Sequence, residues 1–188
     1  MNQRNNAKRC LFIKAIMQKL FSLLMVFAMA SPASAQLPCS DPLYRQFDFW
    51  LGEWEAFGKN GKKAGDSKIS LILDSCIVLE EWTSASVSRG VRYAGKSFNT
   101  YNALTKQWQQ TWVDNVGGST EYLQGRYENN KIIFKTNPFQ LAKDTMAVRR
   151  LTFFNQGKNT VRQLGEISKD NELTWTMEYD LEYRRKKG

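Results

Sequence analysis

The chain has 188 residues and a formal net charge of +9, with 27 basic residues, 18 acidic residues and no histidine. The missing histidine excludes Ser-His and Cys-His nucleophilic systems, and it removes the commonest protein ligand for metals and haem. We therefore expect neither a metal nor a cofactor, and a chain of this length fits one domain.

The first 35 residues have the layout of a secretory signal. An apolar run over residues 20–30 is followed by the small-residue cleavage site 33–35. The run is too short to stay behind as a membrane anchor, and Met17 is an alternative start that would give a shorter signal. We expect export to the periplasm or the exterior, leaving residues 36–188 as a single β-barrel domain. The basic residues of the segment are Arg4, Lys8, Arg9, Lys14 and Lys19.

Most of the net positive charge of the chain comes from this segment. Without its five basic residues the chain carries 22 basic and 18 acidic residues, a net charge of +4. Targeting thus explains the basic excess, and we expect no nucleic-acid partner and no stable membrane insertion after cleavage. The basic run 184–187 is typical of a solvated tail, with attraction to anionic lipid or nucleic acid as the alternative.

Cleavage would remove Cys10 and leave Cys39 and Cys76. In an oxidising compartment an even pair of cysteines predicts one disulfide, which would tie the segment before the first helix to a strand. Two free buried thiols are the alternative.

The stretch 47–54 (FDFWLGEW) predicts a short helix that becomes a strand. Ser40 or Asp41 can cap the helix, and Pro42 suits its first position. Gly52 ends the helical spacing, after which the period changes to two and Trp54 lies on the buried face of a strand. The predicted helical face comprises Leu43, Phe47, Trp50 and Leu51.

Beyond Trp54 the sequence alternates short strands with turn signals. The predicted strands cover residues 67–73, 77–84, 94–101, 107–114, 120–127, 131–136, 146–154, 160–168 and 173–184. With the strand at Trp54 this gives about ten strands at the spacing of an all-β protein. An antiparallel up-and-down barrel with a short N-terminal capping helix is the predicted fold, because even hairpins that close leave no exposed edge. A β-sandwich is the alternative.

The Gly52-x-Trp54 start of the first strand, after a capping helix, resembles the calycin superfamily of lipocalins, fatty-acid-binding proteins and nitrobindins. In those proteins the tryptophan closes one barrel end and meets an arginine from a late strand, so the resemblance implies a Trp54–Arg184 contact. Stretches 47–54, 108–115 and 183–185 together are similar to a bacterial family of exported proteins, which implies a barrel but no activity. Nitrobindins bind haem through a histidine. This sequence contains no histidine, so the resemblance does not imply haem binding.

Two charged doublets predict charges inside the barrel. Neighbouring residues of a strand face opposite sides, so one member of Glu80-Glu81 and one of Arg149-Arg150 should point inward. A buried charge needs a partner. We expect an inward acid and an inward base that pair with each other, as an internal ion-pair network, or with a polar ligand.

Two strands predict the character of the interior. In the strand 107–114 the aromatic face carries Trp108, Gln110, Trp112 and Asp114. The last strand alternates cleanly, which places Leu173, Trp175, Met177, Tyr179, Leu181 and Tyr183 on one face. In the strand before it, Val161, Gln163 and Ile167 look inward.

Such an interior suits a small molecule with apolar rings or chains and a polar handle. The predicted function is binding or carriage of a small amphipathic molecule by Trp108, Gln110, Trp112, Arg150, Gln163, Tyr179 and Tyr183. One alternative is an enzyme acting on a small hydrophobic substrate, with Glu81, Asp114 and Tyr179 as acid–base candidates. The other is an envelope interaction protein whose aromatic residues fill a solid barrel.

Overall fold

The computed structural model describes residues 39–187, so the expected signal segment lies outside the described part of the chain. Within these residues two short 3-10 turns, η1 (Pro42–Arg45) and η2 (Asp48–Trp50), precede eleven strands. No helix in this part is long and apolar enough to cross a membrane. The strands are β1 (Gly52–Gly58), β2 (Lys63–Ile72), β3 (Ile77–Ser88), β4 (Val91–Asn102), β5 (Gln107–Asp114), β6 (Ser119–Glu128), β7 (Lys131–Lys135), β8 (Phe139–Ala142), β9 (Thr145–Asn155), β10 (Thr160–Ser168) and β11 (Thr176–Arg185).

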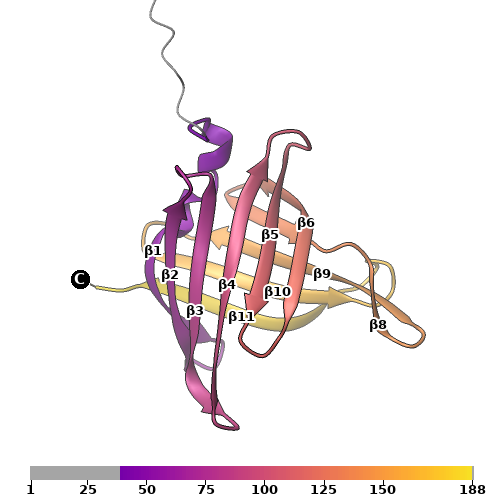
Figure 1. The fold of residues 1–188 in the computed structure, drawn as a ribbon. Helices are drawn as coiled ribbons and strands as arrows, with labels where there is room; N and C mark the ends of the chain where they lie inside the picture. Colours follow the sequence, from indigo (N-terminus) through magenta and orange to yellow (C-terminus); the bar gives the residue numbers. More distant parts are fainter. Residues whose placement is uncertain (1–38, 188) are drawn as a thin grey trace, which may run out of the picture. The chain divides into compact units, whose positions relative to one another are not determined.

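Ten of these strands form a closed antiparallel ring. They pair in the order β10-β11-β1-β2-β3-β4-β5-β6-β7-β9, and the pairing of β9 with β10 closes the ring. In Figure 1, β2 to β5 lie in front and β9 to β11 cross behind them. The predicted up-and-down barrel is confirmed, and the sandwich alternative is wrong because a sandwich leaves unpaired edges that this ring does not have.

Strand β8 departs from the simple meander. It pairs with β9 alone, beyond the point where β7 meets β9. The sequence predicted a loop over these residues, because Asn137-Pro138 reads as a turn signal and the strand is only four residues long. The resulting β8–β9 hairpin extends from the ring (Figure 1).

The segment before β1 is less regular than predicted. Asp41 Oδ1 accepts a hydrogen bond from the Leu43 N–H at 2.8 Å, and Pro42 follows it, as expected for a helix start. The segment then forms two separate 3-10 turns, in which the 3.6-residue period does not hold. Leu43 is therefore 42% exposed, and the predicted helical face is wrong at that position.

Phe47 and Trp50 fill one half of the barrel. The Phe47 ring lies 5.8 Å from Trp108 on β5 and 5.0 Å from Phe153 on β9, and the Trp50 ring lies 5.8 Å from Tyr183 on β11. Since β5 and β11 are well separated in the ring, these side chains bridge different walls of the barrel. We call the cluster of Phe47, Trp50, Trp108, Phe134 and Phe153 the aromatic plug; its members are at most 2% exposed.

The arginine that meets Trp54 is Arg185. The two residues are register partners across β1 and β11, and the guanidinium carbon of Arg185 lies 4.2 Å from the Trp54 ring centroid. The guanidinium also donates to the carbonyl of Leu51 at 2.9 Å. Arg184 points to the other face, where its guanidinium lies 4.3 Å from the Phe57 ring centroid. The implied Trp54–Arg184 contact is wrong, because consecutive strand residues face opposite sides.

Gly52 makes this arrangement possible. Its φ of +124° is open to glycine and strained for other residues. A Cβ on Gly52 would also overlap the guanidinium of Arg185, which lies against the Gly52 backbone. The glycine therefore allows both the backbone conformation at the start of β1 and the position of the Arg185 guanidinium over Trp54.

Cys39 and Cys76 form the predicted disulfide, so the free-thiol alternative is wrong. The bridge spans 37 residues of sequence and joins the chain before η1 to the turn before β3. In the chain-entropy model, closing a loop of this size stabilises the fold by about 3–4 kcal/mol. The Arg45 side chain also donates to the carbonyl of Ser75, which gives the same two segments a second connection.

Candidate functional site

A cavity of about 650 Å³ occupies the half of the barrel away from the aromatic plug. We call it the lumen. On β5 its wall runs from Gln110 through Trp112 to Asp114, away from Trp108, and continues through Gly118 into β6. Gly118 and Ser119, which line the lumen at this end, are exposed, so the lumen meets solvent there, at its mouth. The alternative of a solid barrel therefore does not hold for this half of the molecule.

Glycines of neighbouring strands make room for the aromatic walls of the lumen. A Cβ built on Gly95 would lie only 2.2 Å from a ring atom of Trp112, so the indole lies directly across the backbone of β4. A ring placed in this way lies against the wall, where the glycine leaves space for it, which helps to keep the barrel hollow despite its aromatic lining. The three such pairs are Gly65 with Trp82, Gly95 with Trp112, and Gly165 with Tyr179.

A buried carboxylate lies at the floor of the lumen. Glu80, on β3, is 2% exposed and accepts hydrogen bonds from Ser67 at 2.8 Å and Ser97 at 3.1 Å. The Tyr183 hydroxyl lies 3.3 Å from Glu80 and 2.8 Å from the side-chain oxygen of Gln163, and its single hydrogen can go to either. Glu80 is thus held by hydroxyl groups from the adjacent strands β2 and β4 and from the more distant strand β11.

The same polar layer continues along β4 to β5. Asn99 donates to Ser97 at 3.0 Å and accepts a hydrogen bond from Gln110 at 2.7 Å. Together with Glu80, Tyr183 and Gln163 these side chains form a connected polar layer, which we call the floor. The floor separates the lumen from the aromatic plug.

Burial raises the pKa of Glu80 to about 7, because the charged form loses its hydration while the three hydroxyl contacts only partly compensate. None of the described basic side chains forms an ion pair with it. The carboxyl group therefore changes its charge near neutral pH. A group of this kind can bind a cation when ionised or donate a hydrogen bond when protonated.

A second carboxylate stands nearer the mouth and is held differently. Asp114 accepts hydrogen bonds from the backbone N–H groups of Gly118 and Val116 and from the side chains of Tyr93 and Trp112. Burial opposes its ionisation, but these donors outweigh burial and lower the pKa of Asp114. Asp114 is therefore ionised at neutral pH and ties the β5–β6 turn to the aromatic wall.

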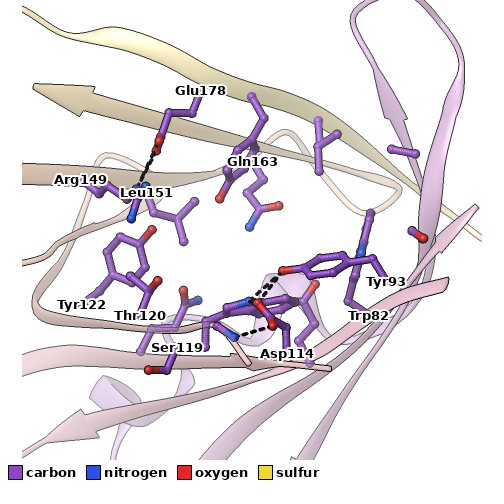
Figure 2. Close-up of a pocket in the computed structure, with 18 of the residues that line it drawn as sticks. Trp82, Tyr93, Asp114, Ser119, Thr120, Tyr122, Arg149, Leu151, Gln163 and Glu178 are labelled. Atoms are coloured by element: carbon purple, nitrogen blue, oxygen red, sulfur yellow. Dashed lines mark hydrogen bonds and ion pairs between the residues drawn. The ribbon is translucent and has the colours of Figure 1, made fainter. Parts of the chain in front are cut away.

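The mouth carries one ion pair on the opposite wall. Arg149 Nε donates to both carboxylate oxygens of Glu178, at 3.2 and 3.0 Å (Figure 2). Nearby, Tyr122 is 7% exposed, and burial raises its pKa to about 12. Burial likewise raises the pKa of Tyr93 to about 12 and that of Tyr183 well above 10. These tyrosines stay protonated and act only as neutral hydrogen-bonding groups at physiological pH.

Most of the predicted ligand-binding residues do line the lumen. They are Gln110, Trp112, Gln163, Tyr179 and Tyr183. Trp108 does not; it lies in the aromatic plug, where its indole N–H donates to Gln46 at 3.0 Å. The prediction for Trp108 is wrong because strand alternation gives the side of a residue but not its depth along the barrel.

In each charged doublet, Glu80-Glu81 and Arg149-Arg150, one residue points inward as predicted. In both cases it is not the residue that was selected as a site candidate. Arg149 lines the lumen, whereas Arg150 lies outside, 2.8 Å from Glu166 and with its guanidinium carbon 4.0 Å from the ring centroid of Trp175. The predicted ligand contact of Arg150 is therefore wrong. The inward acid and base also do not pair with each other, since Arg149 bonds Glu178.

Glu81, the acid–base candidate chosen from the other doublet, pairs with Lys96 on the outer surface at 2.8 Å. Its neighbour Glu80 is the buried member, so the choice of Glu81 is wrong. Asp114 and Tyr179, the other two candidates, do line the lumen.

A β-bulge explains why the last strand was only partly predicted. The register between β10 and β11 shifts at Gly165/Glu166, where Tyr179 and Met177 oppose successive residues and Glu178 is left over. Glu178 and Tyr179 therefore both line the lumen. Trp175, before the bulge, lies with Arg150 outside, so its predicted inward face is wrong.

Sequence reasoning missed several lining residues. Trp82 follows Glu80 by two positions, so the same alternation would have placed it once the correct glutamate was chosen. Tyr93 lies before the predicted start of its strand, which begins at Val91 rather than at residue 94. Tyr122 had a signal too, because it lies on the alternating face of β6.

No group of three or more Cys, Asp or Glu side chains within residues 39–187 is placed to hold a metal ion. Comparison with models of known protein families gives no match, and comparison with curated protein sequences gives none either. The geometry of the lumen is therefore the basis for the functional conclusion.

Proposed function

We propose that this protein is an exported, lipocalin-like binding or carrier protein whose lumen holds a small amphipathic molecule. The observation that carries the proposal is the open cavity of about 650 Å³ with aromatic walls and a polar floor. This volume falls within the range of small-molecule sites, about 300–1,000 Å³. An apolar part of the ligand would lie against Trp82, Trp112 and Tyr179, with its polar group at the floor.

The floor offers groups whose hydrogen-bonding capacity is unused within residues 39–187. Gln110 donates to Asn99, but its carbonyl oxygen has no partner there. The side-chain oxygen of Gln163 lies 2.8 Å from the Tyr183 hydroxyl, but its amide N–H groups have no partner there. Both side chains line the lumen and are at least nine-tenths buried. These atoms are therefore free to bond a polar group of a ligand in the lumen.

The Cys39–Cys76 disulfide supports the exported location, because such bonds persist in oxidising compartments. The closed meander with a Trp54–Arg185 contact at one end supports the lipocalin-like type. Both remain parts of the proposal.

Binding in the lumen can be tested with Nile red, an uncharged dye whose fluorescence rises in apolar sites. Thr120→Trp places a large ring among the lining residues of the mouth, whereas Glu121→Trp places the same ring on the exposed outer face of β6. We expect the dye to bind wild type and Glu121→Trp alike and to lose at least about tenfold in affinity for Thr120→Trp. Equal binding by all three proteins would contradict the proposal.

Native mass spectrometry of the protein isolated from its own cells provides the second test. We expect an adduct of a few hundred daltons on wild type, in keeping with the cavity size, and less of it on Thr120→Trp. An adduct present equally on both proteins would place the small molecule outside the lumen.

A second candidate function is acid–base catalysis on a small hydrophobic substrate. The observation that favours it is Glu80, a lumen carboxyl with a pKa raised to about 7 beside the hydroxyl of Tyr183. If a substrate is turned over, Glu80→Gln should abolish turnover and leave Nile red affinity unchanged. Turnover by that variant would remove Glu80 from the chemistry.

A further inference from the structure

We propose that the polar group of the ligand is a cation, such as a protonated or quaternary amine, held between the Glu80 carboxylate and the faces of the lumen tryptophans. This inference rests on the proposed binding function and specifies the ligand class. It is carried by the charges of the lumen, by the orientation of its rings, and by the way in which Glu80 is held.

The charged residues that line the lumen are mostly acidic. They are Glu80, Asp114, Glu178 and Arg149. Arg149, the one basic member, stands at the mouth and is bonded to Glu178. With Glu80 ionised, the lumen therefore has a net charge of −2. An anionic head group that enters the lumen would lose its hydration and face negatively charged side chains. The one basic side chain that lines the lumen, Arg149, lies at the mouth and is already paired with Glu178.

The aromatic rings add to the same preference. Trp82 and Trp112 lie against the glycines of neighbouring strands and line the lumen, where a ligand can reach the faces of their indoles. Indole faces carry the negative part of the ring quadrupole and attract cations, most strongly where water is excluded. Trp82 lies two residues from Glu80 on β3, and Trp112 lies in the same register row as Glu80, with only Ser97 between them. The carboxylate and both indoles therefore border one region of the lumen.

Glu80 is held by neutral hydroxyl groups and forms no ion pair with a described basic side chain of the protein, so its negative charge is available to a ligand cation. Its contacts are the hydroxyl groups of Ser67 on β2, Ser97 on β4 and Tyr183 on β11. The protein has already removed the carboxylate from bulk water, so a ligand cation would gain the attraction without adding that cost. The other titratable groups that line the lumen are Tyr93, Tyr122 and Tyr179, which stay neutral, and Asp114, Arg149 and Glu178 nearer the mouth.

The test uses three probes with the same ten-carbon chain as competitors of Nile red: decyltrimethylammonium, decanol and decanoate, each below its micelle concentration. At about pH 8.5, where Glu80 is ionised, we expect the ammonium probe to bind at least about tenfold more tightly than the alcohol, and decanoate most weakly. Equal affinities, or a preference for decanoate, would overturn the cation proposal while leaving lumen binding intact. Failure of Nile red itself to bind would overturn both.

Glu80→Gln and Glu81→Gln form a matched pair of variants, because these neighbours lie on opposite faces of β3. We expect the inner change to remove most of the preference for the ammonium probe and the outer change to leave it as in wild type. If Glu80→Gln does not fold, wild type alone gives the result: the preference should shrink several-fold at about pH 6, where Glu80 is protonated. If the preference for the ammonium probe is the same in Glu80→Gln as in wild type, and the same at about pH 6 as at about pH 8.5, Glu80 is not the anionic partner.

Discussion

The two halves of this barrel share the same strands but differ in what fills them. The plug half is solid: Phe47 and Trp50 enter from outside the ring and contact Phe153 at 5.0 and 4.4 Å. The lumen half contains equally large side chains on the wall, including Trp82 and Trp112, yet it is hollow. The difference lies in direction, since the plug rings point across the barrel and the lumen rings lie along its wall.

This contrast shows that aromatic content does not decide whether a barrel is hollow. On β4 the inward face passes from Tyr93, which lines the lumen, through Gly95 and Ser97 beside Trp112 to Asn99 in the floor and Tyr101 near the plug. The small residues leave room for the Trp112 ring against the wall, whereas Tyr101 adds its own ring to the packing near the plug. The polar floor marks the boundary at which one packing mode replaces the other.

The largest effect should come from removing a ring of the plug. Trp50→Ala deletes a fully buried side chain that no neighbour can replace, so we expect a loss of about 3–5 kcal/mol in the free energy of unfolding. Trp82→Ala removes a ring of the same size that already borders a cavity, and it should cost only about 1–2 kcal/mol. Urea unfolding monitored by circular dichroism measures both. Equal losses would contradict the distinction between a solid and a hollow half.

The floor should make stability depend on pH. The folded pKa of Glu80 is about 7 and its ordinary value is 4.5, so the folded state binds more protons between these values. The contribution of Glu80 to the free energy of unfolding should therefore be fully present below about pH 4.5 and be lost, by roughly 3 kcal/mol, as the pH rises through 7. This contribution is read as the difference between wild type and a variant, because other groups also titrate over the acid range.

Glu80→Gln removes the titrating group while keeping its shape. We expect the variant to be more stable than wild type at about pH 8 and to lose this advantage below about pH 5. Glu81→Gln, on the outer face, should follow the pH profile of wild type. A constant difference between Glu80→Gln and wild type across this range would show that the carboxyl group is not desolvated in the folded protein.

A smaller effect is expected where a glycine supports a lumen ring. Gly95→Ala would place a methyl group 2.2 Å from the Trp112 ring and 2.7 Å from the backbone oxygen of Val113, so the ring must move away from the wall and the β4–β5 backbone must shift slightly. We expect a loss of about 1–3 kcal/mol in stability together with weaker Nile red binding, because the displaced ring takes up lumen volume. Gly58→Ala, where the nearest atom is the end of the Asn60 side chain at 3.2 Å, is the control. Unchanged dye binding by Gly95→Ala would mean that the ring does not need the glycine.

The sequence allowed the strands and the closed ring to be predicted, because period-two alternation and turn signals are local properties. It also predicted that one residue of each charged doublet points inward. It did not identify which one, because the parity of a strand is set by its register with its neighbours. Glu80 rather than Glu81 and Arg149 rather than Arg150 follow from pairings that become visible only in three dimensions.

The sequence also did not reveal how deep a side chain lies along the barrel axis or where a strand contains a bulge. Trp108 and Trp112 share a face of β5, and only the position of Phe47 and Trp50 decides that the first belongs to the plug and the second to the lumen. The bulge at Glu178 changes the alternating face of β11, and no residue in that strand signals it. Such features depend on contacts between distant segments, so local patterns do not contain them.

The smallest predicted effect tests the same parity at the plug end. Arg185→Met should cost about 1–2 kcal/mol of stability, because it removes the cation over Trp54 and the hydrogen bond to the Leu51 carbonyl. Arg184→Met loses a contact with Phe57 and an ion pair with Glu182 on the exposed face, and it should change stability by less than about 0.5 kcal/mol. Both variants lose one charge at neighbouring positions, so net charge cannot explain a difference between their urea midpoints. A larger loss of stability from Arg184→Met than from Arg185→Met would contradict the assignment of Arg185 to the inner face of β11. It would also contradict the contact of Arg185 with Gly52 and Trp54.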